Sequence, residues 1–145
     1  MTDPEPRVFL DANILFSAAC QGSVVDQLVE RLTAVAAVVS CDHTIEEARR
    51  NVAVKRPAWA DHLEAWVGRI EAVPTIIFKL PVELAEKDVP VMCSAIRGGC
   101  DLLATSDARD FGHLFDTELH GVRVLSLANL AEWLLEMEAR AGLGG

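Results

Sequence analysis

The chain has 145 residues, of which 51% are hydrophobic, and its formal net charge is −9 at pH 7. These values predict one globular domain over residues 1–145, with residues 1–6 and 142–145 frayed. They exclude a module that binds nucleic acid through bulk positive charge, but they permit an enzyme that meets phosphates through metal ions held by carboxylates.

The apolar runs are too short to span a bilayer, and residues 1–6 lack the apolar segment of a signal peptide. We therefore expect a cytoplasmic protein that does not enter a membrane. Four cysteines show no zinc-site spacing and are expected to be reduced core residues: Cys20, Cys41, Cys93 and Cys100.

The first predicted element is the apolar run Val8–Leu10, which is followed by Asp11 and then by Asn13. A short run of this kind is typical of a strand that is buried on both faces of a parallel sheet. Ligands bind beyond the carboxyl ends of such strands, so Asp11 is a candidate site residue. The alternative is that Asp11 or Asn13 only caps the following helix, because both residue types are preferred at N-caps.

A helix is predicted to begin near residues 22–23, and a second buried strand is predicted over residues 35–40. Thr44 and Glu47 then form the spacing of a capping box, which predicts that a helix begins at Thr44. Glu47 either closes this box or points back toward the ends of the first two strands.

The segment 49–56 holds four of the 13 basic residues of the chain: Arg49, Arg50, Lys55 and Arg56. Charge clusters on helices are usually solvated faces, which is the simpler interpretation. The alternative is an edge that contacts the phosphates of RNA beside an acidic site.

A proline, Pro57, favours the start of the next helix, in which four apolar residues recur at helical spacing: Trp59, Leu63, Trp66 and Ile70. This stripe predicts a surface that packs in the core, with a protein interface as the alternative. A third short strand is predicted over residues 75–78.

Carboxylates mark both ends of the next strand candidate, Asp101–Asp107, and Asp110 follows three residues later. Asp88 stands just before a helix predicted over residues 91–97, where the helix dipole alone favours an acid. Asp107 has the same relation to its strand as Asp11 has to the first strand.

A fifth strand is predicted over residues 122–125, and Ser126 is the expected cap of a last helix whose core face includes Leu127, Leu130, Ala131, Leu134 and Leu135. Strands alternate with helices along the whole chain. The sequence therefore predicts an α/β fold with a mainly parallel sheet of four or five strands.

Four of these acids can meet at one edge of such a sheet if the first and fourth strands are neighbours: Asp11, Glu47, Asp88 and Asp107. Clustered carboxylates repel one another, and a divalent cation removes this penalty. Oxygen ligands in small number suit Mg²⁺ or Mn²⁺. Because the sequence has no glycine-rich phosphate loop and no nucleophile elbow, the chemistry that fits is metal-assisted hydrolysis of a phosphodiester.

Several motifs of one known family occur here in the family's order: Leu10–Asn13, Ser40 with Glu46 and Glu47 ahead of Arg49 and Arg50, Asp88–Val91, and Asp101–Asp107 followed by Asp110 and Phe111. With them the sequence resembles the PIN-domain family, metal-dependent ribonucleases that include the VapC-type toxins of bacterial toxin–antitoxin pairs. The resemblance implies a single three-layer α/β/α domain, an acidic Mg²⁺ or Mn²⁺ site and RNA cleavage. It also implies frequent homodimers and inhibition by a small antitoxin.

Carried over by position, the family's acidic catalytic residues fall on Asp11, Glu47, Asp88 and Asp107, with Asp11, Asp88 and Asp107 as metal ligands. Polar residues that support the site fall on Asn13 and Thr105. Asp110 is a further supporting candidate, with a cap of the short segment after it as the alternative role. Only one of Glu46 and Glu47 can face the site, and Glu47 is preferred because it sits where the family's glutamate precedes a basic pair. Asp101 is a possible further contributor.

Two other functions fit parts of the sequence. A haloacid-dehalogenase-like phosphatase also places an Asp after its first strand, but it usually needs a second Asp at the position of Asn13, and no lysine lies between Asp88 and Asp107. A degenerate domain that only binds RNA or a protein partner would have no metal site that depends on Asp11 and Asp107.

Overall fold

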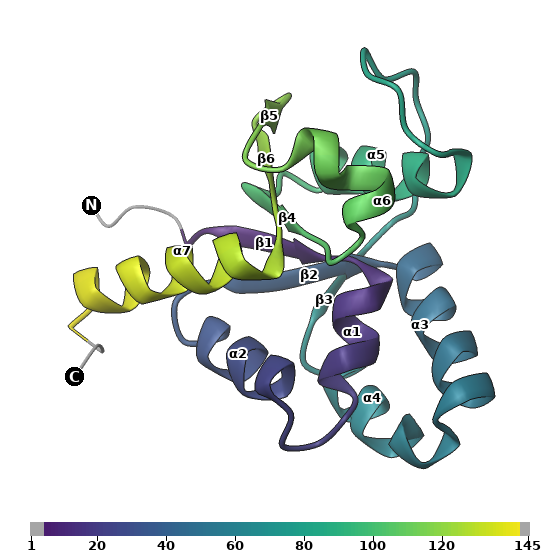
Figure 1. Ribbon diagram of the computed structural model, residues 1–145, viewed down its shortest axis with the longest axis vertical. Helices are drawn as coiled ribbons and strands as arrows, with labels where there is room; N and C mark the ends of the chain where they lie inside the picture. Colours follow the sequence, from purple (N-terminus) through teal and green to yellow (C-terminus); the bar gives the residue numbers. More distant parts are fainter. Residues whose placement is uncertain (1–4, 143–145) are drawn as a thin grey trace.

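Six strands form one sheet in the computed structural model of the chain, which describes residues 5–142 (Figure 1). In chain order the strands are β1 (Arg7–Leu10), β2 (Ala37–Cys41), β3 (Glu71–Val73), β4 (Leu102–Ala104), β5 (Glu118–Leu119) and β6 (Val122–Leu125). Their order in the sheet is β3-β2-β1-β4-β6-β5, and only β5 is antiparallel to its neighbour. The α/β class and the mainly parallel sheet are confirmed.

The sheet has one strand more than the predicted maximum of five because β5 and β6 form a tight hairpin. His120 and Gly121 connect the two strands and both have positive φ, at 49° and 86°. Positive φ at both central residues is characteristic of a type I′ turn. The backbone twist of this turn matches the twist of the two strands that it joins. With only two residues, β5 carried no hydrophobic pattern that the sequence could reveal.

Within residues 5–142, seven α-helices cover the sheet, and three short 3-10 helices join them. The α-helices are α1 (Ala12–Ala18), α2 (Val24–Leu32), α3 (Asp42–Lys55), α4 (Ala60–Val67), α5 (Val89–Arg97), α6 (Ala108–Phe111) and α7 (Leu127–Arg140). The 3-10 helices are η1 (Pro57–Trp59), η2 (Glu86–Asp88) and η3 (Gly112–Leu114). None of the helices in the described part of the chain combines the length and apolar character needed to cross a membrane.

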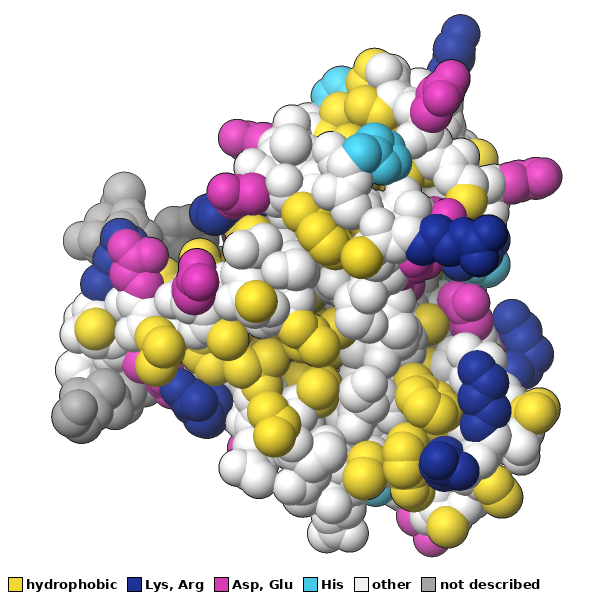
Figure 2. All heavy atoms as spheres, in the orientation of Figure 1, with side chains coloured by type: hydrophobic (Ala, Val, Ile, Leu, Met, Phe, Trp, Pro, Cys, Tyr) yellow, Lys and Arg dark blue, Asp and Glu magenta, His cyan; other side chains and the backbone are white. Residues whose placement is uncertain are grey.

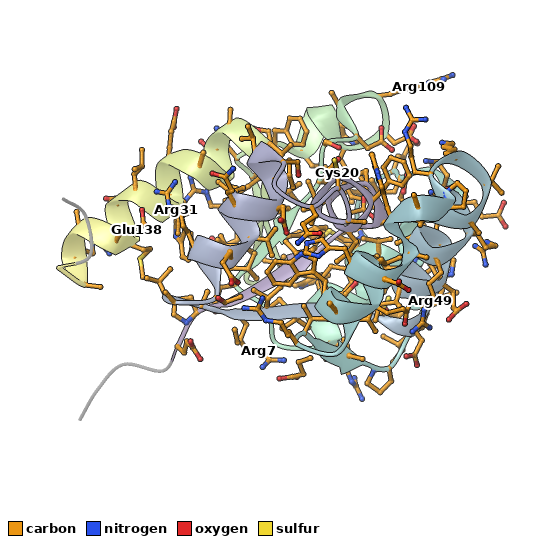
Figure 3. The ribbon with its side chains drawn as sticks, turned by 90° about the horizontal axis from the view of Figure 1, so that it is seen from below. Arg7, Cys20, Arg31, Arg49, Arg109 and Glu138 are labelled. Carbon is orange, nitrogen blue, oxygen red and sulfur yellow. The ribbon has the colours of Figure 1, made fainter. Side chains whose placement is uncertain are left out.

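The sheet lies between two helical layers, as Figure 1 shows. Val8 and Leu10 of β1 are buried in a core with α1, α2, α3, α4 and α7, whereas Phe9 is buried in a second core with α5 and α6. This alternation follows from the period of two along a strand. It confirms that β1 is buried on both faces and that the fold has three layers. Arg31 and Glu138 point toward each other and join α2 to α7 at the edge of one layer (Figure 3).

The strand predicted over residues 75–78 is wrong. The strand β3 ends at Val73 because the next residue, Pro74, has no N–H for the ladder. The residues after it instead bond to α5: the backbone N–H of Ile76 donates to Ser94 Oγ at 3.1 Å, and Cys93 Sγ donates to the carbonyl of Phe78 at 3.3 Å. This segment is therefore tied to a helix and not to the sheet.

Two details of the predicted helices are also wrong. The helix α3 begins at Asp42, so Thr44 is buried inside its first turn and caps nothing. Leu135 of α7 is 60% exposed, because the helix extends along the side of the sheet and turns this residue to solvent. The cap of α7 at Ser126 is confirmed, and Asn129 completes its capping box.

The stripe on the α4 segment is confirmed as core: Leu63, Trp66 and Ile70 are buried, and Trp59 packs against them partly buried. The four cysteines are free, as expected, and three of them are buried. The predicted fraying of residues 1–6 and 142–145 falls mostly on residues outside the described range.

Candidate metal centre

The candidate site lies at the carboxyl ends of the two central strands. Leu10 of β1 pairs with Ala104 of β4, so the residues that follow, Asp11 and Thr105, leave the sheet side by side. The backbone N–H of Asp11 donates to the carbonyl of Ala104 at 3.0 Å, which extends the ladder by one step. The parallel register of two apolar strands thus creates the edge at which the site is built.

All four predicted acidic residues line one pocket at this edge, with a volume of about 340 Å³. The lining residues are Asp11, Ala12, Asn13, Phe16, Glu47, Asn51, Lys55, Lys87, Asp88, Ser106 and Asp107. The pocket therefore draws side chains from four separate segments of the sequence.

Asp11 is buried, with 3% of its surface exposed, and is held by a polar network. Thr105 Oγ1 donates to Asp11 Oδ2 at 2.8 Å, and Asn13 Nδ2 donates both to Asp11 Oδ2 at 3.3 Å and to Thr105 Oγ1 at 3.2 Å. The N–H of Ala12 donates to Asp11 Oδ1 at 2.8 Å, so Asp11 also caps α1. Both interpretations of Asp11 thus describe one side chain, which caps the helix and lines the pocket.

Burial raises the pKa of Asp11, and the hydrogen bonds from Thr105 and Ala12 act against this rise. The negative charges of Glu47 and Asp107 add to it. The carboxyl is therefore fixed in place while its charge is poorly compensated by the protein.

Asp88 is the last residue of η2, immediately before α5, and its side chain is turned inward and buried. Its Oδ2 atom has no hydrogen-bond partner among the described residues. Burial raises the pKa of Asp88 to about 7; the positive charge of Lys87 opposes this shift, and the charges of Asp11, Asp107 and Asp110 add to it. A buried carboxylate oxygen without a partner is costly, and a bound cation would remove that cost.

Asp107 follows β4 and caps the four-residue helix α6, accepting from the N–H of Asp110 at 3.1 Å. Carboxylate oxygens of Asp88, Asp107 and Asp110 lie within 4.8 Å of one another. The supporting candidate Asp110 therefore belongs to this acidic cluster, although it does not line the pocket itself. The all-oxygen set of Asp11, Asp88 and Asp107 suits Mg²⁺ or Mn²⁺.

The helix α3 presents Glu47, Asn51 and Lys55 to the pocket, at intervals of four residues along one face. Glu46 lies on another face, is exposed and pairs with Arg49 at 2.5 Å. The structure thus turns Glu47 toward the site and Glu46 away from it. Asn51 was not predicted, but its position four residues after Glu47 was a usable signal.

The four basic candidates do not come together. Arg49 binds Glu64 at 2.7 Å and so joins α3 to α4 (Figure 3), while Arg56 lies 5.6 Å from the Trp59 ring centroid. Arg50 is exposed. Lys55 lines the pocket, with its amine 5.8 Å from the Phe16 ring centroid. Dark blue side chains lie over α3 in Figure 2, but Lys55 alone of the four reaches the acidic pocket.

Sequence reasoning missed Lys87, which lies within the acidic cluster. Its Nζ atom is 3.1 Å from Asp110 Oδ2, 3.3 Å from Asp107 Oδ2 and 3.7 Å from Asp88 Oδ2. Asp110 and the other acids raise the pKa of Lys87, which keeps the amine charged. A lysine directly before a candidate ligand was the signal that could have identified it.

Asp101, by contrast, lies at the other end of β4. Its Oδ2 atom accepts from the backbone N–H of Arg7 at 2.9 Å, at the start of β1. The whole length of the two strands therefore separates Asp101 from the pocket, and it contributes nothing to the site.

No protein-family profile and no curated protein sequence matches the chain. Solved structures do match it. The crystal structure of VapBC2 from Rickettsia felis bound to a DNA fragment from their promoter aligns with a TM-score of 0.60 and 14% identity, covering 83% of this chain and 98% of the other. The structure of FitAB bound to an IR36 DNA fragment aligns with a TM-score of 0.51 and 19% identity, covering 82% and 94%.

The chain has a PIN-domain fold. The resemblance seen in the sequence motifs is thereby confirmed at the level of the fold. In this fold, the acids that the resemblance selected share one pocket: Asp11 and Asp107 follow the central strands β1 and β4, Glu47 lies on α3, and Asp88 stands directly before α5.

The buried carboxyl of Asp88 is expected to give the protein without bound metal a characteristic pH dependence. Its pKa is about 7 in the folded chain against 3.8 ordinarily, so the folded state binds more protons than the unfolded state between these values. Its contribution to stability is therefore fully present below about pH 4 and is lost as the pH rises through about 7. Calorimetric melts in EDTA should show a melting temperature that falls by several degrees across this window.

The matched control is Asp88→Asn, which cannot ionise and should give a flatter profile over the same range. A divalent cation bound at Asp88 would also remove the fall, because it would favour the ionised carboxylate. Identical profiles for the wild type and Asp88→Asn would contradict the assignment.

Proposed function

We propose that this PIN domain is a Mg²⁺- or Mn²⁺-dependent endoribonuclease, a hydrolase of RNA phosphodiester bonds. The observation that carries the proposal is the buried Oδ2 atom of Asp88, which accepts no hydrogen bond from the described residues and lies in a pocket shared with three other acids. A protein retains such a costly arrangement where a cation is to be bound. Asp11, Asp88 and Asp107 are the proposed ligands.

When bound, the metal ion lowers the pKa of a coordinated water and neutralises charge on the scissile phosphate. Thr105 and Asn13 hold the carboxylate of Asp11 in one orientation through the hydrogen bonds described above. Glu47 faces the same pocket from α3 and is proposed to accept the proton of the attacking water. Lys55 and Phe16 lie at the rim, where a cation and an aromatic ring suit a phosphate and a base of the RNA.

We further propose that the chain is the toxin of a toxin–antitoxin pair, with a small antitoxin as its partner and a homodimer as a possible assembly. The fold likeness to VapBC2 and FitAB supports this proposal. Co-expression with the product of the neighbouring reading frame tests it: a stable complex that suppresses RNA cleavage is expected. Growth inhibition that the neighbour does not relieve would count against it.

Cleavage of a mixed structured RNA pool tests the nuclease proposal. Purified protein should cleave RNA with Mn²⁺ or Mg²⁺, should be inactive in EDTA and should leave DNA of the same sequences intact. Inactivity together with the absence of Mn²⁺ binding would support the degenerate binding module instead. Release of phosphate from a small phosphomonoester, with no RNA cleavage, would support the phosphatase.

A further inference from the structure

The amine of Lys87 lies among carboxylates, as a bound metal cation would. It has three carboxylate neighbours, from Asp88, Asp107 and Asp110, at 3.1 to 3.7 Å. These three acids are also the group whose oxygens lie within 4.8 Å of one another. The amine therefore lies at the outer side of the acidic site.

Asp11 lies on the inner side of the same site. Its carboxylate is not a member of the outer group and is instead bound to Thr105, Asn13 and Ala12. Asp88 and Asp107 connect the two sides, because both line the pocket with Asp11 and both contact Lys87. The site thus offers two neighbouring positions for positive charge, and a side chain fills the outer one.

Many phosphodiester hydrolases use two metal ions about 3.5–4 Å apart, one on each side of the phosphate. An ammonium group cannot polarise a water as a metal does, but it can compensate charge on a phosphate oxygen and on the leaving group. Lysine suits this task because its amine is a compact charge on a flexible stem.

We propose that Lys87 is the built-in second cation of this centre, so that the site takes one divalent ion on the side of Asp11 while the amine of Lys87 holds the outer position. This inference rests on the proposed metal-dependent function. It assigns the amine of Lys87 the place of a second metal ion, with which the amine would compete for the outer position. Removal of the amine should open the outer position to a second Mn²⁺.

The test is Mn²⁺ titration by calorimetry, combined with electron paramagnetic resonance of the bound ions. The wild type should bind one Mn²⁺ per chain. Lys87→Gln should bind two. The second ion should bind at least about tenfold more tightly than any second ion in the wild type, because the ammonium charge that repels a cation at the outer position is removed. The two ions should then show spin coupling that the wild type lacks. Cleavage by Lys87→Gln should become second order in Mn²⁺.

Two variants control for charge. Lys87→Arg keeps the charge and should keep one ion per chain. Arg109→Gln removes a charge from α6, next to the cluster, but Arg109 is exposed and points outward (Figure 3), so the wild-type stoichiometry is expected. The side chain of Lys87 is itself 61% exposed, and thermal melts should show that Lys87→Gln remains folded.

Two outcomes would overturn the inference: two equally tight ions in the wild type, or a single ion in Lys87→Gln. A second ion that enters Arg109→Gln as readily would also overturn it, because bulk charge would then suffice. Absence of Mn²⁺ binding in every variant is a different result, since it would remove the proposed metal-dependent function itself.

Discussion

Asp11→Asn is expected to reduce RNA cleavage by about 10³-fold or more, because a metal ion supplies several kcal/mol of transition-state stabilisation and Asp11 is its proposed innermost ligand. The amide has nearly the same shape as the carboxylate and can still accept from the backbone N–H that Asp11 caps. The two hydrogen bonds that Asp11 Oδ2 accepts, from Thr105 and Asn13, are lost because an amide NH2 takes its place, but an uncompensated buried charge is removed at the same time. The melting temperature should therefore change by only a few degrees.

Single-turnover cleavage and a thermal melt measure the two expectations for Asp11→Asn together. The matched control is Asp101→Asn, the same substitution at the other end of the sheet, where the carboxylate binds the backbone N–H of Arg7. This control should cleave RNA at the wild-type rate. Full activity in Asp11→Asn would show that Asp11 is not a site residue. A large fall in the melting temperature together with the loss of activity would indicate a purely structural role.

Asp88→Asn is expected to change function and stability in opposite directions. Mn²⁺ affinity should fall by about 100-fold or more, because Asp88 is a proposed ligand that lies between the inner and outer positions. Stability of the metal-free protein at neutral pH should rise by about 1 kcal/mol, since the substitution removes a buried charged oxygen that lacks a partner. For a domain of this size that gain raises the melting temperature by roughly 3 °C.

Asp110→Asn is the contrasting variant for Asp88→Asn. Asp110 bonds to Lys87, which lowers the pKa of the Asp110 carboxyl, so its charge is compensated in the folded chain. Its neutralisation should give no gain in stability. A gain of equal size in both variants would show that the total charge of the cluster, and not the environment of Asp88, sets the effect.

The central part of the fold could be predicted because two apolar runs are each followed by a carboxylate. Val8–Leu10 and the run before Asp107 had to be buried, and buried strands in an alternating α/β sequence lie in a parallel sheet. Parallel neighbours bring their carboxyl ends to one edge, so Asp11 and Asp107 were expected to approach each other if their strands were neighbours, and the structure shows that β1 and β4 do pair. The strand predicted over residues 75–78 failed because Pro74 ends the ladder and α5 supplies other hydrogen-bond partners.

The finer details of the site depended on side-chain directions and tertiary partners, which no local pattern contains. The i,i+3 spacing of Glu46 and Arg49 is compatible with a pair on one helix face, but only the fold shows that Glu47 is the glutamate that reaches the pocket. Arg49 belonged to a basic cluster in the sequence, but in the fold it joins two helices through Glu64. Lys87 was passed over because its partners Asp107 and Asp110 lie some twenty residues further along the chain.

The double role of Asp107 links chemistry to local order at the edge of the domain. One of its oxygens holds the N–H of Asp110 in the first turn of α6, a helix of only four residues, while the other faces Lys87. An isolated turn of this length has almost no stability of its own and depends on its cap and on the burial of Phe111. A ligand that binds the Asp107 carboxylate would therefore change the free energy for opening the α6 turn. Amide hydrogen exchange at Asp110 and Phe111 should then report whether such a ligand is bound, without any substrate present.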